Sequence, residues 1–188
     1  ANPETISEAF SLKQTAANLS RRDYFLTQIN VVRTYERLLI LPFGQTLDWD
    51  YPLTTHWDIK TTLSAVLHIL IILFGIFFFA RRRMQTLSII GLGLLWFYLI
   101  LLPESSLIPI IDVIYEHRVY LPMVGICLTF AGILSFISQK FPRFSRSISC
   151  YLFLVTCFLL LSIFTFNRAY VWGDQIRLWA DTAVKAPR

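Results

Sequence analysis

Four long apolar blocks limit what this chain can fold into. They cover approximately Thr61–Ala80, Thr86–Leu102, Val119–Ser138 and Ile148–Phe166. A helix needs roughly 17–25 apolar residues to cross the hydrocarbon core of a bilayer, and inside lipid each backbone polar group must bond within its own segment. The sequence therefore predicts an all-α integral membrane protein with about four transmembrane helices, and it excludes a soluble enzyme.

Composition supports this class. Of the 188 residues, 55% are hydrophobic and only 15% are charged, whereas soluble domains carry about 25% charged residues. The net charge of +5 does not indicate a nucleic-acid partner, because membrane topology accounts for the basic residues. The three cysteines, Cys127, Cys150 and Cys157, lie in apolar blocks and fit small buried hydrophobes better than a disulfide framework.

The loops between the blocks predict an orientation. The turn between the first two blocks and the turn between the last two carry six basic residues and no acidic one: Arg81, Arg82, Arg83, Lys140, Arg143 and Arg146. All twelve Asp and Glu residues fall in the opposite compartment. Because short cytoplasmic loops are rich in Lys and Arg, we expect the N-terminal region, the middle loop and the C-terminus to face the periplasm or a lumen.

The segments outside the blocks complete the expected organisation. Residues 1–60 form an outer region in which Tyr24–Leu41 reads as an amphipathic helix that ends before Pro42 and Gly44. It is expected to lie in the membrane interface, or to turn its polar stripe toward a wet cavity; that stripe is Asn30, Arg33, Thr34 and Arg37. Residues 61–166 form the transmembrane region. Residues 167–188 form an outer soluble helix that starts near Gly173.

The middle outer loop, Pro103–Arg118, mixes many apolar residues with charged ones. A solvated loop is rarely so apolar, and we therefore expect a re-entrant or interfacial loop. Inside the blocks, Gly91 and Gly93 do not form a small-xxx-small pair, so their spacing predicts no particular helix contact.

Two groups of cations are candidates for binding phosphate. Arg33 and Arg37 lie one helical turn apart, and two guanidinium groups on one face can bind a phosphate through forked hydrogen bonds. The alternative is that they meet lipid headgroups or Glu36. In the Glu116-His117-Arg118 cluster, Arg118 could bind an anionic lipid phosphate while Glu116 holds it in place; the alternative is a charge cluster that extends to the interface.

The carboxylates are ambiguous. Asp112 and Glu116 are four residues apart and could serve acid–base chemistry, but a salt bridge to Arg118 or Arg33 is the simpler interpretation. Glu104 either caps a helix in the loop or contacts a substrate.

Two further patterns predict little chemistry. Asp48 and Asp50 form a weak D-x-D pattern, and we predict no metal site. His68 lies inside the first block and is expected to be a packed, neutral histidine.

Several stretches together resemble one family. They are Tyr24–Gln28, Tyr35–Pro42, Gly44-Gln45 leading to Asp48–Pro52, the stretch Pro103–Pro109 with its Pro-Glu-Ser-Ser block, the Glu-His-Arg-x-Tyr-Leu-Pro block at Glu116–Pro122, Asn167–Trp172 and Leu178–Thr182. The chain resembles the membrane portion of bacterial tetratricopeptide-repeat (TPR) membrane proteins. These are similar to the transmembrane-and-TPR O-mannosyltransferases, which are glycosyltransferases of the GT-C class.

The resemblance implies a function. The donor would be a sugar on a polyprenyl phosphate, the acceptor a protein hydroxyl, and no other cofactor is implied. Arg33, Arg37, His117 and Arg118 would bind the lipid phosphate, supported by Glu104, Asp112 and Glu116. The family's catalytic acid lies in a loop that this chain does not contain, so we expect the chain to be part of a longer protein and inactive alone.

The resemblance also implies a location, the bacterial inner membrane with the TPR repeats following Arg188 in the periplasm. The partners would be the bilayer, the lipid-linked sugar, and a protein acceptor or partner subunits. One alternative is a non-catalytic anchor, or a subunit of a larger complex, that presents the repeats to protein partners. A transporter is disfavoured, because transporters place charges or broken helices at mid-membrane and these blocks are nearly free of charge.

Overall fold

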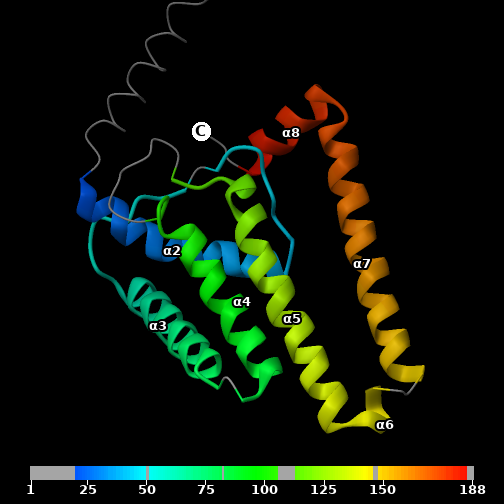
Figure 1. Ribbon diagram of the computed structural model, residues 1–188. Helices are drawn as coiled ribbons and strands as arrows, with labels where there is room; N and C mark the ends of the chain where they lie inside the picture. Colours follow the sequence, from blue (N-terminus) through cyan, green and yellow to red (C-terminus); the bar gives the residue numbers. More distant parts are fainter. Residues whose placement is uncertain (1–19, 50, 82, 106–112, 146–147, 186–188) are drawn as a thin grey trace, which may run out of the picture.

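The computed structural model describes residues 20–49, 51–81, 83–105, 113–145 and 148–185, which form helices joined by loops with no strand among them. The elements are α2 (Arg21–Ile40), α3 (Ile59–Phe79), α4 (Gln85–Leu101), the 3-10 helix η1 (Glu116–Val119), α5 (Tyr120–Lys140), α6 (Pro142–Ser145), α7 (Ile148–Trp172) and α8 (Gln175–Lys185) (Figure 1). The all-α class is confirmed for the described part of the chain.

Three helices are long and apolar enough to cross a membrane. They are α3 with 21 residues, η1 and α5 together with 25, and the Tyr151–Trp172 part of α7 with 22. The helix α4 is also apolar but has 17 residues. The predicted blocks match α3, α4 and α5 closely, whereas α7 continues beyond Phe166 to Trp172. These apolar helices are consistent with an integral membrane protein.

Glycines set the spacing of α3, α4 and α5. A Cβ atom on Gly91 would lie 2.3 Å from the backbone nitrogen of Phe79 on α3, and a Cβ atom on Gly93 would lie 2.3 Å from the carbonyl oxygen of Gly125 on α5. The backbones are therefore too close for any side chain at these positions. Because small residues let membrane helices approach closely, Gly91 and Gly93 hold α4 against a different helix on each side, a role that their spacing did not predict.

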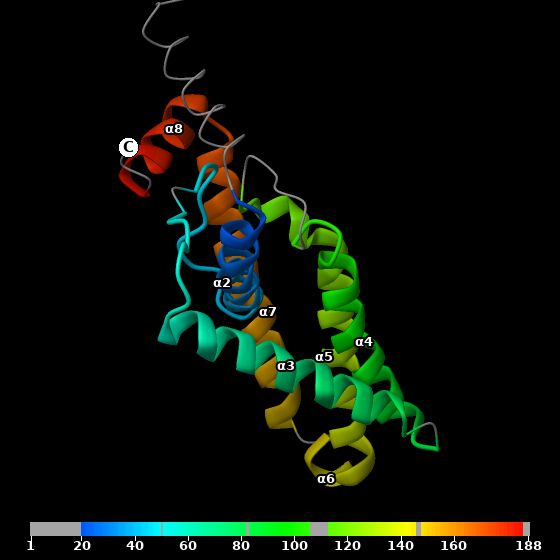
Figure 2. The ribbon, with the colours of Figure 1, turned by 90° about the vertical axis from the view of Figure 1, so that its left-hand side faces the viewer.

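The helix α2 lies across α3 and α4 (Figures 1 and 2). Its residues Val31, Val32 and Tyr35 form a core cluster with Phe97 and Leu101 of α4. Its buried polar residue Asn30 hydrogen-bonds Thr61 Oγ1 at 2.9 Å and accepts from Ser64 Oγ at 3.1 Å, both on α3. Part of the predicted polar stripe therefore faces another helix, and neither a headgroup layer nor a wet cavity.

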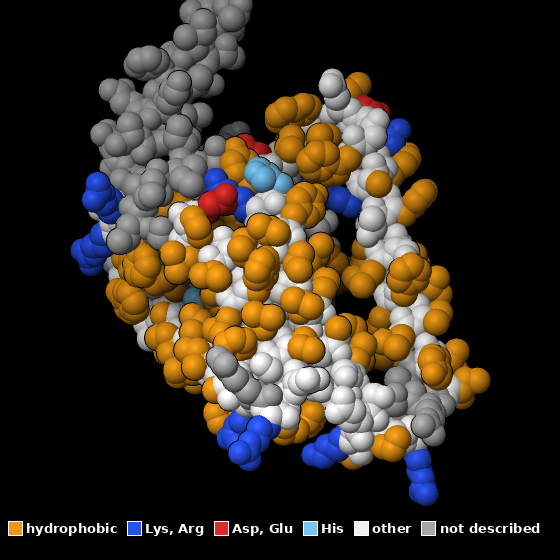
Figure 3. Space-filling model, in the orientation of Figure 1, with side chains coloured by type: hydrophobic (Ala, Val, Ile, Leu, Met, Phe, Trp, Pro, Cys, Tyr) orange, Lys and Arg blue, Asp and Glu red, His pale blue; other side chains and the backbone are white. Residues whose placement is uncertain are grey.

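Basic and acidic side chains gather at opposite ends of the helices. The turns that contain Arg81, Lys140 and Arg143 lie together at one end, which we call the basic end, and acidic side chains lie near the other (Figure 3). We call the end that carries Glu104, Glu116 and Asp181 the acidic end. This separation agrees with the predicted grouping of the described charges. Arg82 and Arg146 lie outside the described residues.

The helix α7 stands apart from the others. None of its spanning window is buried, and Figure 3 shows open spaces between it and the body formed by α2 to α5. Near its acidic end, the ring of Phe164 contacts that of Phe43, with 4.9 Å between centroids. The helix α8 follows after Gly173, close to the predicted start.

The predicted re-entrant or interfacial loop at 103–118 lies partly outside the described residues, which omit 106–112. Its described ends are the turn after α4 and the segment of Val113 to Tyr115 that leads into η1. Whether the loop enters the membrane therefore stays a prediction.

Candidate functional site

The predicted site residues lie on α2, on the turn after α4 and in η1, at the acidic end of the helices. Arg33 and Arg37 belong to α2, and Glu116, His117 and Arg118 form most of η1. The structure thus brings both predicted cation groups to the same end of the fold. Asp112 lies outside the described residues.

Arg118 is held by Glu104. Its Nε lies 3.1 Å from Glu104 Oε2, and the Arg118 side chain is 9% exposed while that of Glu104 is 49% exposed. The guanidinium carbon also lies 5.1 Å from the centroid of the Tyr115 ring, which is within the range of a cation–π contact. The predicted partner of Arg118 was Glu116, and the structure supplies Glu104 in its place.

Two tyrosines of α2 fasten this segment to the core. The Tyr24 hydroxyl donates to the Glu104 carbonyl at 2.7 Å, and the Tyr35 hydroxyl accepts from the Tyr115 backbone N–H at 3.0 Å. Burial raises the pKa of Tyr35, although the Tyr115 hydrogen bond and the Arg118 charge act in the opposite direction. The Tyr35 hydroxyl is therefore a protonated structural group and no general base.

Glu116 and His117 point to different neighbours. Glu116 Oε1 accepts from Thr46 N at 2.8 Å and from Trp49 Nε1 at 3.2 Å, so this carboxylate fixes the loop after α2. His117 is exposed and stacks on Tyr115, with 4.9 Å between ring centroids. Of the predicted cations in η1, His117 is therefore the more accessible.

The two arginines of α2 differ in their partners. Arg37 Nη1 donates to the carbonyl oxygen of Phe43 at 3.0 Å, which holds the chain where α2 ends. Arg33 is half-buried, and within the described part of the chain its guanidinium forms no hydrogen bond or ion pair. Among the four predicted phosphate ligands, Arg33 alone combines a fixed charge, partial burial and freedom from an internal partner in the described residues.

A polar cluster beside Arg33 was missed by the sequence analysis. His68 Nδ1 lies 3.0 Å from Glu36 Oε1 and 3.2 Å from the Tyr98 hydroxyl, and His68 Nε2 lies 2.9 Å from the Ile29 carbonyl oxygen. The expectation of a packed histidine is right about burial, but the ring is paired with a carboxylate. The sequence did contain a signal for this cluster. A histidine inside an apolar block needs polar partners, and few polar side chains are available to the helices beside it.

A second ionic cluster joins α7 to α8. Asp181 Oδ2 lies 2.7 Å from Arg168 Nη1, and Asp181 Oδ1 lies 2.7 Å from Lys185 Nζ. Lys185 Nζ also donates to the Gln45 carbonyl at 2.7 Å. Burial alone would raise the pKa of Asp181, but hydrogen bonds from Lys185 and Arg168 outweigh it, and the net pKa is lowered. This cluster fastens α8 to α7 and to the loop after α2.

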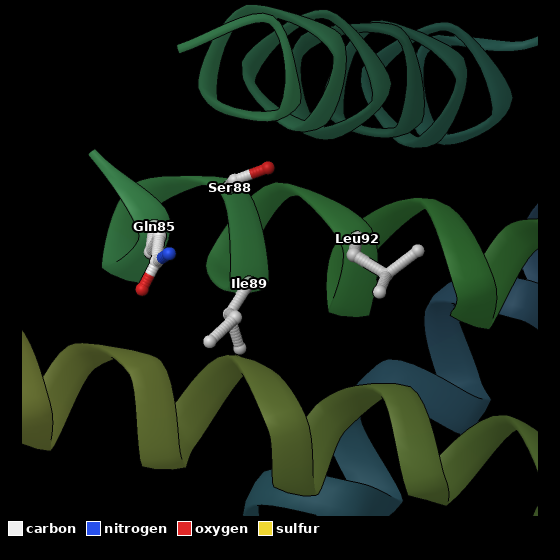
Figure 4. Close-up of a pocket in the computed structure, with 4 residues that line it drawn as sticks. All are labelled: Gln85, Ser88, Ile89 and Leu92. Atoms are coloured by element: carbon white, nitrogen blue, oxygen red, sulfur yellow. The ribbon is translucent and has the colours of Figure 1, made fainter. Parts of the chain in front are cut away.

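The described residues hold no group of three metal-ligating side chains. The D-x-D pattern lies partly outside them, because Asp50 is not described. A shallow hollow on α4 is lined by Gln85, Ser88, Ile89 and Leu92 (Figure 4). It lies toward the basic end, far from the predicted cations, and its Ser88 hydroxyl donates to the Phe79 carbonyl, so it adds nothing to the candidate site.

The chemistry of the acidic end is therefore that of a half-buried cation, Arg33, next to a carboxylate–imidazole pair and close to aromatic residues of the loops. Such an arrangement can hold an anionic group at the edge of apolar helices. In comparisons with family models, with curated proteins and with solved structures, nothing matches this chain.

Proposed function

We propose that this chain is part of a membrane glycosyltransferase that uses a sugar linked to polyprenyl phosphate, and that it contributes the surface that binds the phosphate of the lipid donor. In this proposal α4 crosses the membrane with α3, α5 and α7, and the acidic end faces the periplasm of a bacterial inner membrane. The acceptor is a protein hydroxyl.

The observation that carries the proposal is the guanidinium of Arg33, which has no hydrogen bond or ion pair among the described residues. Each of the other predicted arginines has an internal acceptor, Glu104 for Arg118 and the Phe43 carbonyl for Arg37. A buried or half-buried arginine normally finds an acceptor, so one without a described partner favours an external anion. The apolar helices around it favour an anion that is attached to a lipid.

The alternative function, a membrane anchor that presents repeats to protein partners, has its own supporting observation. Arg118, Glu116 and Asp181 are all engaged in contacts that hold loops and helices together, as expected of a scaffold. In that case Arg33 meets ordinary lipid headgroups and shows no preference for a polyprenyl phosphate.

Binding of a short-chain polyprenyl phosphate to the chain in nanodiscs, followed by tryptophan fluorescence, tests the proposal. Because hydrogen bonds to charged groups contribute about 1.5–3 kcal/mol, Arg33→Ala is expected to weaken binding by roughly 10-fold or more. Arg37→Ala is the matched control on the same helix and is expected to have a smaller effect, since that side chain already bonds to Phe43.

The lipid component gives a second control. Neutral polyprenol of the same length is expected to bind weakly to both the original chain and Arg33→Ala. Equal binding of polyprenol and polyprenyl phosphate, or equal losses for Arg33→Ala and Arg37→Ala, would contradict the proposal and favour the anchor.

A further inference from the structure

Three polar side chains from three helices meet beside the apolar core: Glu36 of α2, His68 of α3 and Tyr98 of α4. The side chains of Glu36 and His68 are 15% and 12% exposed. Tyr98 donates a hydrogen bond to the same carboxylate oxygen that faces His68. These contacts join α2, α3 and α4, in addition to the hydrogen bonds of Asn30 with Thr61 and Ser64 between α2 and α3.

The hydrogen bond to Ile29 fixes one proton of the histidine ring. His68 Nε2 lies 2.9 Å from the Ile29 carbonyl oxygen, and a backbone carbonyl can only accept a hydrogen bond. Nε2 therefore carries a hydrogen. In a neutral imidazole the other nitrogen, Nδ1, then has no hydrogen and presents a lone pair.

His68 Nδ1, Glu36 Oε1 and the Tyr98 oxygen lie within hydrogen-bond distance of one another, and the contacts that Glu36 Oε1 makes with the other two atoms each require a proton. Nδ1 lies 3.0 Å from Glu36 Oε1 and 3.2 Å from the Tyr98 oxygen, and the Tyr98 hydroxyl also contacts Glu36 Oε1. The single hydroxyl proton of Tyr98 can serve only one side of this triangle. If it serves the Tyr98–Glu36 contact, a bare Nδ1 would face a carboxylate oxygen at hydrogen-bond distance with no proton between them.

We infer that Glu36 and His68 together bind one proton, either as an imidazolium facing a carboxylate or as a neutral imidazole that accepts from a carboxylic acid, and that this proton fastens α2 to α3. Among the described residues, the other charged group that acts on the ring is Arg33 of α2, whose positive charge opposes that of an imidazolium, while Tyr98 is the titratable group that α4 contributes. The inference goes beyond the lipid-phosphate function and does not depend on it.

The bound proton makes stability depend on pH with a definite sign. In the unfolded chain above about pH 6.5, the glutamate is ionised and most of the histidine is neutral, so the unfolded pair binds less than one proton. The folded pair binds one, whichever of the two residues carries it. Stability from this pair is greatest between about pH 4.3 and pH 6.5, the ordinary values of glutamate and histidine, and it falls as pH rises above that range, by up to tenfold in the folding equilibrium constant per pH unit.

Nitrogen-15 NMR of the histidine rings, together with infrared spectroscopy of the carboxyl groups, counts the proton directly in the chain in detergent micelles at pH 7.5. The expected result is either a His68 ring with hydrogen on both nitrogens or a protonated Glu36. A neutral ring together with an ionised Glu36 carboxylate would overturn the inference, and this result does not depend on whether any variant folds.

Variants then test whether the proton shared by Glu36 and His68 causes the pH dependence of stability. In Glu36→Gln an amide nitrogen in the place of Oε1 donates one hydrogen to Nδ1 and the other to the Tyr98 oxygen without any bound proton, so the stability of this variant between pH 6.5 and pH 8.5 is expected to lose the His68-dependent slope. His56→Gln is the control, because His56 is exposed in the loop before α3, and it is expected to keep the slope. An unchanged slope in Glu36→Gln would count against the inference.

Discussion

The helices α3, α4 and α5 form one packed unit, whereas α7 is equally suited to a membrane but packs against little. The difference does not lie in apolarity, since α3, α5 and α7 are all long and apolar enough to span a bilayer. It lies in small residues: α3, α4 and α5 contain glycines at their contacts, and α7 contains no glycine.

This contrast has a physical cause. Lipid tails are as apolar as the side chains of a helix, so burial of apolar surface gives little drive for helices to associate within a bilayer. Close backbone contact and polar contact supply the drive in its place. The unit of α3 to α5 has the first, whereas α7 is joined to the rest near the acidic end by Phe164 and through the contacts of Arg168 with α8.

The largest expected effect comes from filling one of the two closest glycine contacts. In Gly93→Leu the Cβ atom alone would lie 2.3 Å from the Gly125 carbonyl oxygen, and a backbone atom cannot turn aside as a flexible side chain can. We expect α4 and α5 to separate, with a loss of about 3 kcal/mol or more in the free energy of unfolding, measured by denaturant titration in micelles.

Gly173→Ala is the matched control for this substitution. At Gly173 the nearest atom to an added Cβ is the Ala169 carbonyl oxygen at 3.5 Å, an ordinary van der Waals distance. We expect a change within about 0.5 kcal/mol. Similar losses for the two variants would show that glycine contacts do not distinguish α4 and α5 from α7.

The sequence predicted the positions of α3, α4 and α5 because helices in apolar blocks follow from length and backbone hydrogen bonding alone, and it predicted α2 from an amphipathic pattern. It did not predict that Gly91 and Gly93 face opposite partners. That result depends on which helices are neighbours, and a spacing rule within one helix does not contain this information. The end of α7 was missed for a related reason: Asn167 and Arg168 end the apolar run, but Arg168 is paired with Asp181, and the helix continues.

The candidate site was predicted in part. Arg33 and Arg118 were identified by residue type, but their different surroundings follow from contacts distant in sequence, such as Arg118 with Glu104. The pairing of Glu36 with His68 joins residues of two helices that cross. The position of His68 in an apolar block indicates that the ring needs a polar partner, but it does not indicate that the partner is Glu36. Sequence reasoning thus found charges at the edge of apolar blocks and could not assign their partners.

An intermediate effect is expected from a substitution at the ionic contact between α7 and α8. Asp181→Asn removes the charge that pairs with Arg168 and Lys185, and because hydrogen bonds to charged groups contribute about 1.5–3 kcal/mol, α8 is expected to open more often. Faster hydrogen exchange of α8 amides measures this. Asp174→Asn is the control, since its Arg177 pair is more exposed, and a similar gain in exchange for that variant would contradict the role given to Asp181.

The same contact predicts a pH dependence. Because the folded pKa of Asp181 is lowered, its contribution is present above the ordinary aspartate value of about 3.9 and is lost as pH falls through the lower folded value. Protection of α8 should therefore persist from pH 7 down to about pH 4 and decline below it. In Asp181→Asn this decline should be absent, and an identical acid profile in both chains would exclude Asp181 as its cause.

The smallest effect is expected on the exposed surface of α7. Phe158 is 71% exposed, so in a bilayer its side chain contacts lipid. In Phe158→Ala lipid fills the vacated space, and the free energy of unfolding should change by no more than about 0.5 kcal/mol. Phe97→Ala removes the same side chain from α4, where Phe97 is 2% exposed in the core cluster with Val31 and Tyr35, and it should lower stability because it leaves a cavity. Both are measured by the same denaturant titration. A large loss for Phe158→Ala would mean that a protein surface covers α7 in the membrane, and the contrast with α3, α4 and α5 would then reflect a missing neighbour and not a difference in packing.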